Sequence, residues 1–398
     1  MASPNPIAGG AAGAGIAGGA PPMADGTGSA GGMLRMAGGT GVAGGTLPMA
    51  GAAATPVLSS EQIAELQAEV RALAAERNAV ILAHNYQVPE VQDVADYVGD
   101  SLGLSRQAAA APEQTIVFCG VHFMAETASV LCPEKTVLIP DLDAGCSLAD
   151  TIDAQQLRAW KAEHPDATVV MYVNTSAEVK ALTDYCCTSS NAVEVVRHIY
   201  ATQGAGAEIL FGPDMWLGSY VEKQLGKPMH VWDGECHVHA GIRPADIERT
   251  RAEHPDADFL IHPECGCTTS VMEYVAAGDV SRDDVLMLST GGMLSYAQQA
   301  ERAERERGGH AEQRSAHARG GRREAVVATE VGMLHPLRMA APDVEFIPAN
   351  PEASCQFMKM ITLPKLRDSL RDLRYEVRVP REIAEPAKVP IDRMVAIG

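Results

Sequence analysis

An internal repeat constrains the fold of this chain more than any other feature of its sequence. Cys146 and Cys236 lie 90 residues apart, and the same pentapeptide, Glu-His-Pro-Asp-Ala, begins 17 residues after each. Each cysteine also follows a short apolar run typical of a buried strand, at 136–139 and 229–232. Repeated sequence of this kind predicts repeated structural units, each with a cysteine just beyond the carboxyl end of an equivalent strand.

A third unit is recognisable behind an insertion. The apolar run 344–348 leads to Cys355, which lies 119 residues after Cys236. This spacing exceeds the repeat by 29 residues, about the length of a polar stretch at 298–323 that is rich in Arg, Glu, Gln, Gly and His. We interpret that stretch as a helix extension that runs into a polar loop.

Strand-like runs recur at equivalent places in the three units. They lie at 80–83, 169–173 and 259–261, and again at 116–119, 209–212 and 326–329. Helical patterns separate them, so each unit is expected to be a parallel sheet covered by helices. We therefore predict an α/β fold of three pseudo-symmetric three-layer α/β/α domains with short parallel sheets around a central metal centre.

The repeat also sets the expected domain boundaries. These are 59–150 with 370–385 for the first domain, 151–240 for the second, and 241–369, including the insertion 298–323, for the third. Residues 1–58 are dominated by Gly, Ala, Met and Pro, with only Asp25 and Arg35 charged, so we expect a disordered tail.

Composition excludes several classes of function. A formal net charge of -19 repels phosphate backbones, so nucleic acid is not an expected partner. The sequence contains no run of 18 apolar residues, so no membrane span is expected. Nine cysteines, an odd number, occur without a secretory signal pattern, which favours a reducing compartment, the cytoplasm.

Three of the cysteines stand apart because they alone occupy the repeated position: Cys146, Cys236 and Cys355. The other six lie in or beside apolar runs or in pairs that lack zinc-site spacing: Cys119, Cys132, Cys186, Cys187, Cys265 and Cys267. Three thiolates at one point suit a 4Fe-4S cluster in which one iron has no protein ligand. Such an open iron is a Lewis acid for a substrate hydroxyl or carboxylate.

Small hydroxyl residues open a predicted helix in each unit, at 99–103, 187–191 and 288–292. Free backbone N–H groups and the positive end of the helix dipole favour an anion there. Three such helix starts around one centre indicate a substrate with carboxylates or phosphate. Lys180, Arg338 and Lys359 could each contact phosphate, but we expect them to be solvated charges.

Four strings closely resemble quinolinate synthase: 84–87 (HNYQ), 120–128 (GVHFMAETA), 187–192 (CTSSNA) and 262–265 (HPEC). The resemblance covers about residues 60 to 370. It implies three α/β domains around a 4Fe-4S cluster held by three cysteines. It also implies a transferase that condenses iminoaspartate with dihydroxyacetone phosphate to quinolinate, with loss of phosphate and two waters, in de novo NAD biosynthesis.

The resemblance assigns roles by matching position. The implied cluster ligands are Cys146, Cys236 and Cys355, as the repeat already indicates. The implied substrate-binding residues are His84, Ser101, Tyr172, Asn174, Ser189, His262, Glu264 and Thr290. The implied catalytic residues are Tyr86, Glu264, His84, Tyr172 and His239. Within these sets Glu264 is the expected general base, Tyr86 a mobile acid/base or binding group, and His239 a member of a hydrogen-bonded triad with Tyr172 and Ser189.

Two alternatives remain open at this point. A 4Fe-4S hydro-lyase for another small carboxylic acid would use the same open iron, and an iron-sulfur sensor would use the cluster without catalysis. The acidic balance and the lack of a basic helix count against a sensor. For a quinolinate synthase, an L-aspartate oxidase or dehydrogenase is a candidate transient partner that supplies iminoaspartate.

Overall fold

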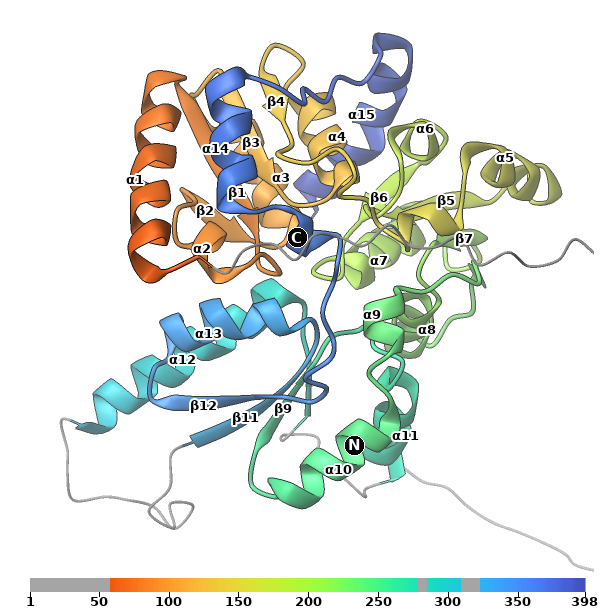
Figure 1. Ribbon diagram of the computed structural model, residues 1–398. Coiled ribbons are helices and arrows are strands. Elements are labelled where there is room, and N and C mark those ends of the chain that lie inside the picture. The colour runs from red at the N-terminus through yellow and green to blue at the C-terminus, as the bar shows by residue number, and fades with distance from the viewer. Residues whose placement is uncertain (1–57, 278–284, 309–322, 398) are drawn as a thin grey trace, which may run out of the picture. The chain divides into compact units, whose positions relative to one another are not determined.

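The computed structural model describes residues 58–277, 285–308 and 323–397 (Figure 1). The expected disordered tail at 1–58 lies outside the described residues except for its last position. All described residues belong to one compact unit, Val57–Gly398.

Three four-stranded sheets form the framework of this unit (Figure 1). The strand orders are β2-β1-β3-β4, β6-β5-β7-β8 and β10-β9-β11-β12, so each sheet repeats one topology. All paired strands run parallel. Their bounds are β1 (Ala79–His84), β2 (Tyr97–Gly99), β3 (Thr115–Cys119), β4 (Thr136–Leu138), β5 (Thr168–Tyr172), β6 (Tyr185–Cys187), β7 (Ile209–Gly212), β8 (His230–Val231), β9 (Asp258–Ile261), β10 (Val285–Met287), β11 (Arg323–Ala328) and β12 (Val344–Pro348). The predicted α/β fold with three parallel sheets is confirmed.

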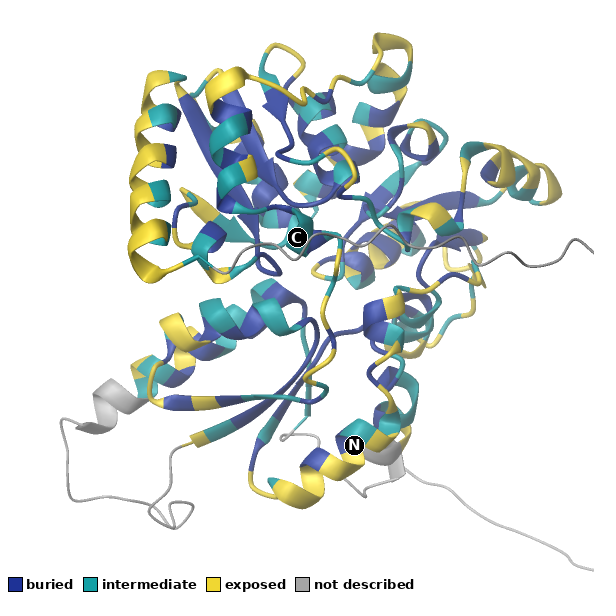
Figure 2. Ribbon diagram, in the orientation of Figure 1, coloured by how far each residue is buried: buried dark blue, intermediate teal, exposed yellow. Residues whose placement is uncertain are grey.

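One strand of each sheet has no counterpart in the sequence prediction. These strands, β2, β6 and β10, are three residues long and lie at a sheet edge. Unlike the similarly short β4 and β8, they are not closely followed by one of the repeated cysteines. The inner strands β1, β3, β5 and β7 are buried at every position, as expected of strands covered on both faces (Figure 2).

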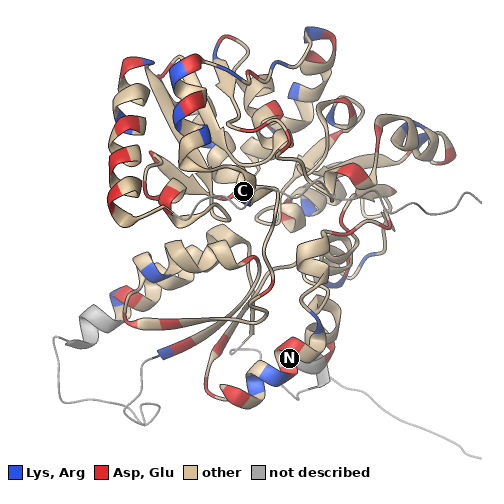
Figure 3. Ribbon diagram, in the orientation of Figure 1, with Lys and Arg blue, Asp and Glu red and all other residues tan. Residues whose placement is uncertain are grey.

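Helices cover the sheets and carry much of the surface charge (Figure 3). Their bounds are α1 (Ser60–Glu76), α2 (Pro89–Gln92), α3 (Ser101–Ala110), α4 (His122–Leu131), α5 (Ala154–Glu163), α6 (Ala177–Lys180), α7 (Ala192–Gln203), α8 (Met215–Leu225), α9 (His237–Ala240), α10 (Pro244–Glu253), α11 (Thr268–Ala277), α12 (Thr290–Gly308), α13 (Leu334–Ala340), α14 (Leu363–Asp372) and α15 (Arg381–Ala396). Helices α1 and α14 pack together against the first sheet, and α3 packs with α4. The last helix, α15, contacts α3 and α4 as well as α6 and β6, so it joins the first and second sheets.

The repeated pentapeptide is a helix end followed by a strand start. Glu163 ends α5 and Glu253 ends α10, and the histidine that follows each has nearly the same backbone angles, φ -132° and ψ 68° for His164 and φ -129° and ψ 69° for His254. The next residue is a proline, which cannot continue the helix. The two copies of the pentapeptide therefore form the same turn between a helix and a strand.

The polar insertion is described in part. Helix α12 continues to Gly308, which confirms the expected helix extension, and residues 309–322 lie outside the described residues. None of the described helices combines the length and apolar character needed to cross a bilayer.

Candidate active site and metal centre

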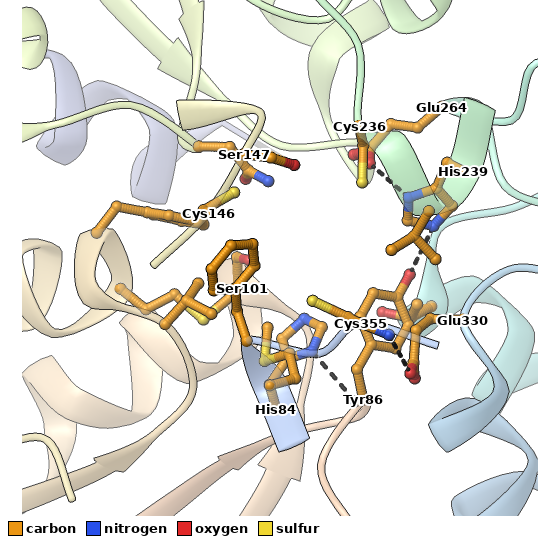
Figure 4. A pocket seen from close by; sticks show the side chains of 18 of the residues that line it. His84, Tyr86, Ser101, Cys146, Ser147, Cys236, His239, Glu264, Glu330 and Cys355 are labelled. Carbon is orange, nitrogen blue, oxygen red and sulfur yellow. Dashed lines mark hydrogen bonds and ion pairs between the residues drawn. The ribbon is translucent and has the colours of Figure 1, made fainter. Parts of the chain in front are cut away.

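The carboxyl ends of the three sheets share one cavity (Figure 4). All thirteen residues assigned from the sequence line it, namely His84, Tyr86, Ser101, Cys146, Tyr172, Asn174, Ser189, Cys236, His239, His262, Glu264, Thr290 and Cys355. Parallel strands present their carboxyl ends on one edge, where ligands bind. Residues far apart in the sequence therefore meet because each follows a strand.

The local structure explains how the strands position these groups. His84 and Tyr172 are the last residues of β1 and β5, and His262 follows β9 directly. Ser101 and Thr290 are the first residues of α3 and α12. The strands are buried and held by their neighbours, so these side chains stand on a rigid edge.

The three repeated cysteines differ from the other six. All nine lie within the described residues and are free thiols, but Cys146, Cys236 and Cys355 alone are partly exposed. Figure 4 shows their sulfur atoms directed into the space between the three sheets. Burial raises the pKa of the Cys146 thiol to about 12, and burial likewise raises the pKa values of Cys236 and Cys355.

This donor set fits a metal-sulfur centre. A thiolate is stabilised by a cation beside it, and three thiols on one cavity wall supply the soft ligands that iron-sulfur clusters use. Cys236 Sγ also lies within 4.8 Å of one ligand atom each from His239 and Glu264.

Tyr86, His239 and Thr329 form a buried hydrogen-bonded group at the cavity wall. The Tyr86 hydroxyl lies 2.6 Å from Thr329 Oγ1 and 3.2 Å from His239 Nε2, and His239 Nε2 lies 2.9 Å from Thr329 Oγ1. His239 Nδ1 is 3.2 Å from Glu264 Oε2. These contacts differ from the expected triad with Tyr172 and Ser189: the imidazole instead contacts Tyr86 and Thr329, which follows β11, the neighbour of β9.

Glu264 is a buried carboxyl group with an unused oxygen. Its Oε1 atom has no hydrogen-bond partner among the described residues, and the same holds for Asn174 Oδ1. Burial raises the pKa of Glu264 to about 7, and the Tyr172 hydroxyl opposes this shift. Buried acceptors are rarely left unpaired, so the cavity has places for donors of a bound molecule.

Three imidazoles on the same wall are neutral. Burial lowers the pKa values of His84 and His239 to about 3, and lowers that of His262 well below its usual value. The rings of His239 and His262 are stacked with centroids 4.8 Å apart. Neutral imidazoles can donate one hydrogen bond and accept another.

The three helix starts meet, as the sequence predicts. Asp100 caps α3 and also accepts a hydrogen bond of 2.6 Å from Ser190, just before α7. A Cβ on Gly291, in the first turn of α12, would lie only 2.8 Å from Asp100 Oδ2. The three helix amino ends therefore converge, with Ser101, Ser189 and Thr290 on the cavity wall.

Glu330 is a site residue that the sequence analysis did not single out. Its side chain is 0% exposed, and its Oε1 atom accepts a hydrogen bond of 2.9 Å from the backbone N–H of Cys355 and forms an ion pair of 2.9 Å with Lys359. Its Oε2 atom accepts from the Gly332 N–H at 2.7 Å. Glu330 follows the second strand run of the third unit, so its position behind β11 was the available signal.

Two lysines contradict the expectation of solvated charges. Lys359 pairs with Glu330 and also donates to the Tyr86 carbonyl. Lys180 is 0% exposed and donates to the Thr175 carbonyl. The hydropathy of lysine predicts that its side chain is solvated. In the folded protein, an acceptor group close to the ammonium stabilises the lysine away from bulk water.

The fold and site define a class: an α/β protein of three parallel sheets whose shared cavity carries three cysteine thiols, a buried carboxyl group and neutral imidazoles. The family model for the quinolinate synthetase A protein matches residues 68–306 and 311–396. The chain belongs to this family, and the match reaches further toward the carboxyl end than the sequence strings indicate.

Curated relatives span nearly the same length. The chain is 54% identical over 338 residues to a quinolinate synthase of Mycobacterium sp. strain KMS, which covers 84% of this chain and 92% of that protein. It is 54% identical over 332 residues to the quinolinate synthase of Mycobacterium tuberculosis strain H37Rv, with 83% and 88% covered. It is 52% identical over 333 residues to a quinolinate synthase of Thermus thermophilus, with 84% and 97% covered.

Proposed function

We propose that the protein is a quinolinate synthase, a transferase of de novo NAD biosynthesis. It condenses iminoaspartate with dihydroxyacetone phosphate and releases quinolinate, phosphate and two waters. The observation that carries this proposal is the convergence of all thirteen assigned residues on one cavity, in a chain that is 52–54% identical to quinolinate synthases.

Cys146, Cys236 and Cys355 would hold a 4Fe-4S cluster through three thiolates. When bound, the cluster supplies a Lewis acid, because one iron lacks a protein ligand. The partial exposure of these three cysteines toward the cavity, and the burial of the other six, support this choice of ligands.

The chain's own residues account for binding of the anionic substrates. Ser101, Ser189 and Thr290 stand at the converging helix starts, where hydroxyls and backbone N–H groups bind carboxylate or phosphate. Asn174 Oδ1, which lacks a partner among the described residues, accepts a hydrogen bond from a substrate N–H or O–H. His84, Tyr172 and His262 complete the walls and exclude water.

Glu264 is the proposed proton-transfer residue, and the hydrogen-bonded group of Tyr86, His239 and Thr329 lies beside it. Glu264 Oε1 has no protein partner among the described residues, so it can take a proton from a substrate carbon and return it to oxygen. Oε2 lies 3.2 Å from His239 Nδ1, a contact that is not a hydrogen bond. Tyr86, hydrogen-bonded to His239 and Thr329, is the acid/base or binding group at the other side of the imidazole.

Iminoaspartate must be made by another enzyme, and imines hydrolyse in water. An L-aspartate oxidase or dehydrogenase in transient contact is therefore the proposed supplier. Nine free thiols fit a reducing compartment, so we place the reaction in the cytoplasm.

An oxygen-free preparation tests the proposal. The protein should be brown, contain about four irons per chain, and form quinolinate from dihydroxyacetone phosphate and freshly generated iminoaspartate. Cys236→Ser should abolish cluster and activity together, whereas Cys119→Ser, at a buried thiol away from the cavity, should spare both.

Two outcomes would count against it. A colourless preparation with full activity would exclude the cluster. A brown protein that makes no quinolinate but dehydrates a small hydroxy acid would favour a hydro-lyase instead.

A further inference from the structure

Three potential metal ligands gather at the edge of the second sheet opposite the cavity. His164 follows the last residue of α5, Glu208 immediately precedes β7, and His230 is the first residue of β8. The strands are parallel, so all three lie at amino ends. Strand β5 has five residues, and at about 3.3 Å per residue the two edges are roughly 13–17 Å apart. The cluster is thus separate from the active-site cavity.

Their donor atoms converge on one carboxylate oxygen. Glu208 Oε1 lies 2.6 Å from His164 Nδ1 and 2.9 Å from His230 Nε2. The imidazole centroids are 4.1 Å apart, and one donor atom from each of the three residues lies within 4.8 Å of the others. The side chains are 23%, 41% and 47% exposed for His164, Glu208 and His230, which leaves room for water to complete a coordination shell.

The distances are close to those that an ion requires. Imidazole nitrogen and carboxylate oxygen bind Zn²⁺ and similar ions at about 2.0–2.2 Å, so neighbouring ligand atoms lie about 3.0 Å apart in octahedral and about 3.4 Å apart in tetrahedral geometry. The carboxylate oxygen, now 2.6 and 2.9 Å from the two nitrogens, would need to withdraw by up to about 0.8 Å. Two imidazoles and one carboxylate suit a first-row transition ion rather than Mg²⁺ or Ca²⁺.

The third unit contains the equivalents of His164 and Glu208 but not of His230. Comparing the two units therefore distinguishes a structural role of the histidine–glutamate pair from a metal-binding role. His254 Nδ1 lies 3.0 Å from Glu324 Oε2, the equivalent pair behind the second copy of the pentapeptide. The strand register makes Glu208 and Glu324 equivalent, because each precedes the residue that pairs with the first residue of β5 or β9.

The third ligand is specific to the second unit. His230 pairs with Leu210, and the residue at the equivalent place in the third sheet is Ile347, which pairs with Val326. A histidine–glutamate pair alone therefore serves to tie a helix end to a strand. His230 adds a third potential metal ligand, which that structural role does not require.

We propose that His164, Glu208 and His230 form a surface site for a divalent first-row transition ion such as Zn²⁺, Co²⁺ or Ni²⁺. The ion joins the end of α5 to β7 and to the two-residue edge strand β8, which leads to Cys236. The site is independent of the reaction proposed for the cavity.

Co²⁺ binding to the cluster-loaded protein, measured without oxygen by calorimetry and by cobalt absorption, tests the site. The wild-type chain should bind one Co²⁺. His230→Ile, which places the third unit's residue in the second, should weaken binding at least tenfold. His254→Ala, the matched control in the third unit, should leave binding unchanged.

Two further readouts locate the ion. At a Co²⁺ concentration a hundred times the dissociation constant, Tm should rise by about 3–4 °C in the wild type and not in His230→Ile. Crystals soaked in Co²⁺ should show an anomalous peak between the two imidazoles. Equal binding by wild type and His230→Ile, no binding by either, or a cobalt spectrum dominated by sulfur ligation would overturn the proposal.

Discussion

Replacing Glu330 by glutamine should destabilise the protein through two backbone N–H groups and one lysine. The carboxylate is 0% exposed and serves three donors: the N–H groups of Cys355 and Gly332, and Lys359. A glutamine offers one acceptor oxygen and an NH₂ group in place of two acceptors. Either orientation of its amide therefore turns a donor toward at least one backbone N–H.

The magnitude follows from the groups that lose a partner. A hydrogen bond to a charged group contributes about 1.5–3 kcal/mol, and a buried N–H without an acceptor costs about 1–3 kcal/mol. Lys359 is 25% exposed and keeps part of its hydration, so we expect a total of about 2–4 kcal/mol. For a unit of about 340 residues the entropy of unfolding is roughly 0.7 kcal/mol/K, so Tm should fall by about 3–6 °C.

Calorimetry of the cluster-loaded protein without oxygen measures this change. A double-mutant cycle with Lys359→Met should yield a coupling energy of at least about 1 kcal/mol, since the two charges stabilise each other. The control is Glu385→Gln, which breaks an ion pair with Arg381 of 2.6 Å in which both side chains are mostly exposed, and it should change Tm little. The reasoning would be refuted if the losses of unfolding free energy from Glu330→Gln and Lys359→Met added within about 0.5 kcal/mol. It would also be refuted if Glu330→Gln changed Tm as little as the control does.

Two further substitutions probe the cavity. Glu264→Gln keeps the shape but removes the proposed base, so quinolinate formation should fall by about 10²–10⁴-fold with iron content and Tm unchanged; loss of iron would instead indicate a structural role. Gly291→Ala places a Cβ about 2.8 Å from Asp100 Oδ2, which should cost about 1–3 kcal/mol and lower Tm in calorimetry. Gly206→Ala is its control, because no atom lies within 4 Å of that Cβ, and an equal effect of the two changes would contradict the steric argument.

Continuous apolar runs were sufficient to predict every strand of the three sheets except β2, β6 and β10. Runs such as 80–83 and 209–212 are apolar at every position, and the structure buries them on both faces as parallel strands. The edge strands β2, β6 and β10 were not predicted, because they are three residues long and, unlike the similarly short β4 and β8, they are not closely followed by one of the repeated cysteines. The 90-residue repeat predicted equivalence, and the three sheets share one strand order.

Part of the candidate site could likewise be predicted from the sequence, and part could not. Residues at strand ends, such as His84 and Tyr172, could be placed because all carboxyl ends of a parallel sheet face one edge. The partners of His239 could not, since Thr329 lies 90 positions away and reaches it only when β11 pairs with β9. Lys180 was placed in solvent because its buried acceptor, the Thr175 carbonyl, is a feature of the folded backbone.

The sequence by itself determined three equivalent α/β units, each with a cysteine beyond a strand end. The repeat and the apolar runs can be read directly from the order of residues along the chain. The tertiary structure alone decided which side chains that are distant in the sequence touch. The contact between buried Glu330 and partly exposed Lys359, and the convergence of His230 on His164 and Glu208, depend on atoms placed within a few tenths of an ångström. Such distances are set by the packing of whole elements, for which no short pattern of residues carries a signal.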